Sequence, residues 1–102
     1  MAIHISVVAR TPNEAVLTVT GRLSQDAVPL LDGELSRILV DAQRVVLDLK
    51  HVRFIDNHGL ASLRRWTLAR PAHARQPQVR LSVRDGSRFV RLRLASRGLA
   101  VD

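Results

Sequence analysis

The sequence contains no cysteine. This absence excludes disulfide bonds, cysteine-ligated zinc, iron–sulfur clusters and thiol nucleophiles. Aromatic residues are scarce as well, because Phe54, Trp66 and Phe89 are the only three. Proteins that bind single-stranded nucleic acid usually stack bases on aromatic side chains placed between basic groups, and this chain offers little for such binding.

Long apolar runs are also missing. The longest spans residues 27–31 and includes Pro29, whereas a membrane-spanning helix needs about 20 apolar residues. Residues 1–10 lack the basic segment and the long apolar segment of a secretion signal. We therefore expect no membrane span and a cytoplasmic location; an oligomer is compatible with the sequence.

Lysine is nearly absent, and the charge is nevertheless strongly basic. Lys50 is the one lysine among 16 basic residues, which face 9 acidic residues for a net charge of +7. Residues 1–50 carry a net −1 and residues 51–102 a net +8. Such a surface favours nucleic acid, an anionic membrane surface or an acidic protein as partner. The alternative is that the arginines only face solvent and that the charge marks no partner. No recognition motif accompanies the charge, so we expect no specific nucleic-acid partner.

The length of 102 residues and the 46% of hydrophobic residues predict one folded domain over 1–102. Apolar residues alternate with polar ones in the expected strands, and the segment 44–49 looks buried on both faces. In the first expected helix, Ser24 or Asp26 is a candidate cap, and Asp32 lies on the polar face. We predict strands at 3–8, 16–20, 44–49 and 79–84 and helices within 24–39 and 60–70.

The segment 88–97 carries two conflicting patterns. Val90, Leu92 and Leu94 alternate with arginines as in a strand, whereas Phe89, Val90 and Leu94 also fit a short helix that Ser87 would cap. We predict an α/β fold of order β-β-α-β-α-β-α, followed by a short final strand. Its mixed sheet would have helices packed mainly on one side.

The corner at Asp56–Leu60 is the most informative segment. Asp56 lies where a helix begins and is able to accept a hydrogen bond from the N–H of His58 or Gly59. Gly59 lets neighbouring backbone approach closely. A helix start of this kind suits an anion or a peptide carbonyl; the alternative is a well-capped turn without a ligand.

A longer segment around this corner resembles a known family. The segment 45–63 reads Val-Val-Leu-Asp-Leu-Lys-His-Val-Arg-Phe-Ile-Asp-Asn-His-Gly-Leu-Ala-Ser-Leu. It resembles the signature of STAS domains, the sulfate-transporter and anti-sigma-factor-antagonist modules. The segments 21–24 and 89–99 resemble flanking parts of that family. The chain stops at residues 98–102, about where the family's last strand begins, so the resemblance predicts either that the closing helix is missing or that the sequence is a fragment.

In this family the residue after the motif aspartate is typically a Ser or Thr that a partner kinase, itself an anti-sigma factor, phosphorylates. Asn57 stands at that position and has no hydroxyl, so the resemblance implies partner binding without the usual switch. Ser24 stands where relatives commonly have an Asp. The expected partner surface is the corner and the exposed face of the following helix. It comprises Ser24, Asp56, Asn57, His58, Gly59, Leu60, Ser62 and Arg65.

The resemblance implies a non-catalytic module with one of two kinds of partner. The first is an anti-sigma factor or serine-kinase-like protein of the GHKL type. The second is the ATPase of a lipid-transport ABC complex, which some free-standing STAS proteins bind. We expect no cofactor, and no metal site, because the histidines lack the paired spacing of zinc ligands. These are His4, His51, His58 and His73.

Overall fold

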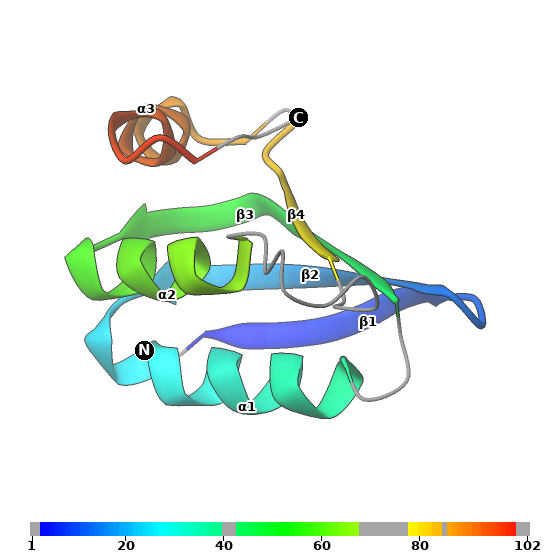
Figure 1. Ribbon diagram of the computed structural model, residues 1–102. Coiled ribbons are helices and arrows are strands. Elements are labelled where there is room, and N and C mark those ends of the chain that lie inside the picture. Colours follow the sequence, from blue (N-terminus) through cyan, green and yellow to red (C-terminus); the bar gives the residue numbers. More distant parts are fainter. Residues whose placement is uncertain (1–2, 40–42, 68–77, 85, 100–102) are drawn as a thin grey trace.

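The computed structural model describes residues 3–39, 43–67, 78–84 and 86–99. Within these ranges the chain forms a four-stranded sheet in the order β1-β2-β3-β4, in which β1 runs antiparallel to β2 and the other pairs are parallel (Figure 1). The strands are β1 (His4–Arg10), β2 (Glu14–Leu23), β3 (Arg44–Ile55) and β4 (Gln78–Ser82). The helices are the 3₁₀ turn η1 (Gln25–Ala27), α1 (Val28–Ile38), α2 (Asn57–Thr67) and α3 (Arg88–Ser96). This order confirms the predicted α/β fold.

The hairpin of β1 and β2 turns at Thr11. Its Oγ1 accepts a hydrogen bond from the N–H of Glu14 at 3.0 Å, and its own N–H donates to the carbonyl of Glu14 at 2.8 Å. β2 then extends beyond its predicted end, through Gly21 to Leu23. Gly21 has a φ of 111°, which is open to glycine at little cost, and the register with β3 shifts directly after it. The strand therefore bulges here instead of ending.

Helices α1 and α2 pack on the same side of the sheet (Figure 1). Strands β2, β3 and β4 follow one another in a single direction, and right-handed crossovers then place both connecting helices on one face. Leu47 on that face is fully buried, whereas Val46 and Asp48 on the other are half-buried. The prediction that 44–49 is buried on both faces is therefore wrong for the second face, which α1 and α2 do not cover.

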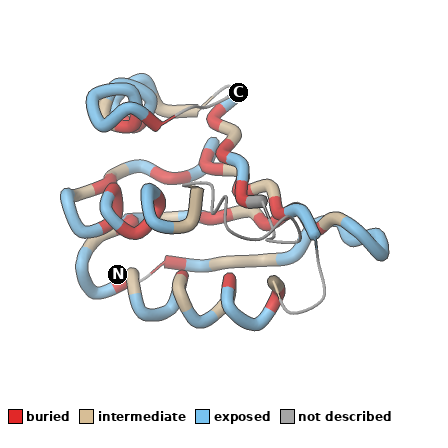
Figure 2. Tube along the Cα trace, in the orientation of Figure 1, coloured by how far each residue is buried: buried red, intermediate tan, exposed pale blue. Residues whose placement is uncertain are grey.

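Helix α3 lies apart from α1, beyond β3 (Figure 1). β4 pairs only with residues 44–48 of β3, so the second half of that long strand lacks a partner strand on this side. α3 packs against β3 there and covers an edge that would otherwise expose unpaired backbone groups. The tube in Figure 2 is buried where α3 faces the sheet, at Val90 and Leu94, and exposed on its outer side.

The structure resolves the conflict at 88–97 in favour of a helix. Ser87 Oγ accepts a hydrogen bond from the N–H of Val90 at 3.4 Å, which confirms the predicted cap. The predicted helix stop at Pro71 lies outside the described residues, and so does His73. Of the residues 98–102, where the short final strand was expected to begin, Gly98 and Leu99 are described and are not in a strand. No helix among the residues described is long and apolar enough to cross a membrane.

Candidate functional site

Asp56 joins the ends of β2 and β3 to the start of α2. Its Oδ1 accepts a hydrogen bond from the N–H of Gly59 at 2.8 Å, and its Oδ2 accepts one from the N–H of Gln25 at 3.0 Å. Its own N–H donates to the carbonyl of Leu23 at 3.2 Å. The carboxyl ends of parallel neighbours meet at one edge of the sheet, so one carboxylate is able to hold both connections. The predicted cap of α2 is confirmed.

Gly59 allows α2 to begin directly against the end of β2. A Cβ at this position would overlap the carbonyl oxygen of Leu23 and would come within 3.1 Å of the Ile55 side chain. The predicted close approach is confirmed, and it holds the exposed Asn57 and His58 in fixed positions at the edge of the sheet.

The start of α1 differs from its prediction. The side chains of Ser24 and Asp26 cap no helix N–H group; instead the carbonyl of half-buried Ser24 accepts the N–H of Ala27 at 2.9 Å. The 3₁₀ turn supplies this backbone bond. Asp56, more than thirty residues away in sequence, accepts the N–H of Gln25 at the start of this turn.

Two arginines, Arg93 in α3 and Arg97 directly after its end, reach the side chain of Asn57. Its Oδ1 accepts hydrogen bonds from Arg97 Nη2 at 2.9 Å and from Arg93 Nη2 at 3.2 Å. These partners were not predicted, because residues 93 and 97 share a face in a helix and in a strand alike, and the contact depends on where this segment lies relative to Asn57. The i, i+4 spacing of the two arginines was the signal that pointed to them.

A pocket opens beside Asn57, with a volume of about 140 Å³. Leu60, which is buried, and Ala61, which is exposed, contribute its apolar lining. The side chains of Arg64 and Arg97 contribute its positive charge. The pocket therefore combines a hydrogen-bonding amide, an apolar surface and two cations at the start of α2.

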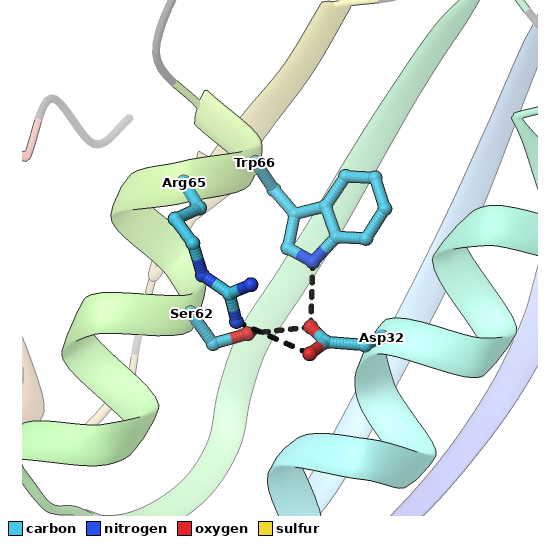
Figure 3. Close-up of polar contacts among 4 residues, drawn as sticks. All are labelled: Asp32, Ser62, Arg65 and Trp66. Carbon is cyan, nitrogen blue, oxygen red and sulfur yellow. Dashed lines mark hydrogen bonds and ion pairs between the residues drawn. The ribbon is translucent and has the colours of Figure 1, made fainter.

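Ser62 does not lie on the exposed face of α2, contrary to the prediction. Its side chain is fully buried, and its Oγ donates to Asp32 Oδ1 of α1 at 2.8 Å. Asp32 also accepts from Trp66 Nε1 at 2.7 Å and from Arg65 Nη2 at 3.1 Å (Figure 3). The expected place of Asp32 on the outer face of its helix is therefore wrong as well. These four residues are called the Asp32 cluster below.

The Asp32 cluster shifts the titration of its carboxyl group. Burial by itself would raise the pKa of Asp32, but the hydrogen bonds from Trp66, Ser62 and Arg65, together with the positive charge of Arg65, outweigh burial and lower it. The carboxylate is thus ionised and compensated, and it joins α1 to α2. Of the partner-surface residues predicted from sequence, Arg65 is exposed but already forms an ion pair with Asp32.

The comparison with protein families decides where this fold belongs. The family model described as "Mlab, STAS domain" matches residues 6–100. The chain belongs to the STAS domain family. No curated protein matches it significantly.

Solved structures share the fold of this STAS domain. The anti-sigma factor antagonist SpoIIAA in its unphosphorylated form has a TM-score of 0.69 and 16% identity, over 97% of this chain and 87% of that one. An anti-sigma factor antagonist from Mycobacterium paratuberculosis has a TM-score of 0.67 and 19% identity, over 97% and 84%. A DUF3478 protein with a SpoIIAA-like fold from Shewanella loihica PV-4 has a TM-score of 0.55 and 12% identity, over 99% of this chain and 82% of that one.

No group of three or more histidine or acidic side chains lies close enough to hold a metal ion among the residues described. The side chain at position 57 is an amide that accepts two hydrogen bonds from arginine. The exposed polar residues at the corner are therefore suited to contact another molecule.

Proposed function

We propose that this STAS domain is a non-catalytic regulatory module that binds a protein partner through its corner at Asp56–Leu60. The rigid presentation of Asn57 and His58 carries the proposal. Both are exposed, while the bonds of Asp56 and the close contact at Gly59 hold the backbone beneath them. A surface held in one conformation loses little entropy when a partner binds, which favours affinity.

The partner that the family resemblance favours is a GHKL-type anti-sigma factor or serine kinase. Asn57 replaces the hydroxyl that such a kinase would phosphorylate, so we infer binding that this modification does not interrupt. The amide oxygen is held by Arg93 and Arg97, and the amide stays neutral at every physiological pH. The surface would thus remain in its unmodified, partner-binding state.

Calorimetric titration with the purified GHKL-type kinases of the same organism tests this proposal. His58→Trp places a bulky group on the corner and should weaken binding at least about tenfold. Ser36→Trp is the matched control, because Ser36 is exposed on α1, and its affinity should equal that of the wild type. Equal weakening by both variants, or by neither, would contradict docking at the corner.

The phosphorylation chemistry has a test of its own. Incubation of the wild type with the bound kinase and labelled ATP should leave residue 57 unmodified, whereas Asn57→Ser should take up label. Mass spectrometry locates the site. Stoichiometric labelling of the wild type at Ser24 or Ser62 would show that a switch is present after all.

A second candidate partner is the ATPase subunit of a lipid-transport ABC complex. The observation in its favour is the same fixed amide at position 57, because a permanent subunit needs no phosphorylation switch. The two candidates separate in one experiment. The kinase and the ATPase are each titrated with the wild type, His58→Trp and Ser36→Trp. Only the true partner should bind the wild type and Ser36→Trp equally well and His58→Trp more weakly.

A further inference from the structure

The arginines around Asn57 carry positive charge that no carboxylate of the described residues compensates. Arg64, Arg93 and Arg97 form no ion pair with any carboxylate within the described ranges. Asp56, which precedes Asn57, already accepts two backbone N–H groups. Asn57 offers the arginines an uncharged oxygen, which is a weaker acceptor for a guanidinium than a carboxylate.

One of these arginines also leaves a buried donor unused. The Nε–H group of Arg93 is buried and has no hydrogen-bond partner in the part of the chain that the structure describes. A buried donor without a partner is unfavourable, and a native structure usually satisfies such a group or reserves it for a ligand. The arginines therefore have donor capacity beyond what Asn57 takes up.

The pocket beside Asn57 determines what kind of anion fits. Arg64 and Arg97 line a volume of about 140 Å³ together with Leu60 and Ala61. A carboxylate on a short aliphatic stem matches both parts, since its two oxygens fit the planar fork of a guanidinium while its methylene groups contact the apolar lining.

Exposed apolar side chains adjoin the arginines. The rings of Phe54 and Phe89 stack with centroids 6.1 Å apart, and the guanidinium of Arg93 lies 6.0 Å from the Phe89 centroid. Phe89 is 48% exposed and Leu92 60%. Arginine and aromatic residues grouped in this way are typical of the centre of protein interfaces.

We propose that the pocket between Arg64 and Arg97 binds the carboxylate of a Glu or Asp side chain in an acidic segment of the protein partner, while apolar residues of that segment contact Phe89 and Leu92. The inference rests on the proposed function and specifies the partner's chemistry. The apolar lining and the exposed apolar side chains favour an acidic protein segment over the phosphates of nucleic acid.

A defined peptide pair tests the proposal without knowledge of the partner. The probe is a short acetylated and amidated peptide in which Glu alternates with Leu and Ala, and the matched peptide carries Gln in place of Glu. NMR titration of the labelled protein should give saturable shifts of the Asn57 side-chain amide and of the Nε–H groups of Arg64 and Arg97 with the Glu peptide. The Gln peptide should bind at least about tenfold more weakly.

Charge-matched variants locate the site. Arg97→Gln and Arg64→Gln should each weaken binding of the Glu peptide about tenfold. Arg44→Gln removes the same charge from the opposite, exposed end of β3 and should leave the affinity unchanged. Equal weakening by all three variants, equal binding of both peptides, or no shift at Asn57 up to millimolar peptide would each overturn the proposal.

The test also separates this inference from the proposed function. If the purified partner binds the wild type, loses affinity with His58→Trp and binds Arg64→Gln and Arg97→Gln as well as the wild type, the corner is the docking surface and the carboxylate pocket is refuted. Duplex DNA, anionic vesicles and the Gln peptide are each added as competitors to the complex with the Glu peptide. If DNA or vesicles displace the Glu peptide from Asn57 more strongly than the Gln peptide does, the choice of an acidic protein segment is overturned.

Discussion

The two ends of helix α2 carry polar groups in opposite states of charge compensation. At its carboxyl end, the carboxylate of Asp32 accepts bonds from Ser62, Arg65 and Trp66 (Figure 3). At its amino end, the neutral oxygen of Asn57 accepts bonds from Arg93 in α3 and from Arg97 directly after it. Asp32 uses a charge to hold two helices together, whereas the charges around Asn57 exceed what the fold needs.

This difference separates structure from recognition. A compensated and half-buried group such as Asp32 contributes to folding and leaves little for a partner. Uncompensated arginines beside a pocket contribute little to folding and are able to interact with an acidic molecule, where they also speed the encounter. Substitutions at the carboxyl end should therefore change stability, and substitutions at the amino end should change binding.

The largest effect is expected where α2 touches β2, because a change there disturbs both ends of the helix. Gly59→Ala forces a Cβ against the carbonyl oxygen of Leu23, and we expect a loss of about 3 kcal/mol in the free energy of unfolding. Gly33→Ala on α1 is the control, because nothing lies within 4 Å of its Cβ. It should stabilise by about 0.5–1 kcal/mol in denaturant titrations. Similar losses for both variants would refute the close contact.

Asp32→Ala breaks the compensated end alone. It leaves the donors of Ser62 and Trp66 without an acceptor, so we expect a loss of about 2 kcal/mol in unfolding free energy. Glu34→Ala removes an exposed ion pair with Arg37 on the same helix and should cost less than about 0.5 kcal/mol. Binding of the Glu peptide should not change in either variant. A loss of peptide affinity with Asp32→Ala would show that the two ends are coupled.

The pH dependence of stability sharpens the same point. The folded-state pKa of Asp32 is lowered, so its contribution is present above the unfolded-state value of about 4 and is lost as the pH falls through the folded-state value. The stability difference between the wild type and Asp32→Asn should therefore be constant near neutral pH and shrink in acid below about pH 4. A difference that stays constant throughout the acid range would contradict the lowered pKa.

Asn57→Asp reverses the state of the amino end with the smallest effect on stability. The introduced carboxylate gains Arg93 and Arg97 as charged partners but adds a like charge next to Asp56. We expect a gain of at most about 1 kcal/mol that high salt removes. The same variant should bind the Glu peptide at least about tenfold more weakly, because it supplies the anion itself. Unchanged peptide affinity would contradict a shared site.

The local parts of this architecture were predictable and the long-range parts were not. Asp56 caps the helix that follows it by accepting the N–H of Gly59. Residue type alone indicated this cap and a close contact at Gly59, but not that the contact is with Leu23 or that Asp56 also binds Gln25. Asn57 meets Arg93 and Arg97 across 36 and 40 residues, and Asp32 meets Ser62 across 30. Such pairs depend on how helices are placed relative to one another, which periodicity does not determine.

The strands show the same limit. Residue patterns located each of them, but they did not reveal the bulge at Gly21 that lets β2 reach Leu23. At 88–97 the apolar residues fit both a period of two and a short helix, so periodicity alone left the choice open. The helix forms because Val90 and Leu94 bury one stripe along the free half of β3, and only the three-dimensional arrangement shows that this half is free.

The central claim is that the partner binds at the amino end of α2 and not at its carboxyl end. Cross-saturation NMR of the labelled domain in complex with the purified partner tests it directly. We predict a footprint that covers residues 57–61, Phe89 and Arg97 and omits Asp32 and Trp66. A footprint over Asp32 and Trp66, or along the edge strand β1, with no change at residues 57–61 would contradict it.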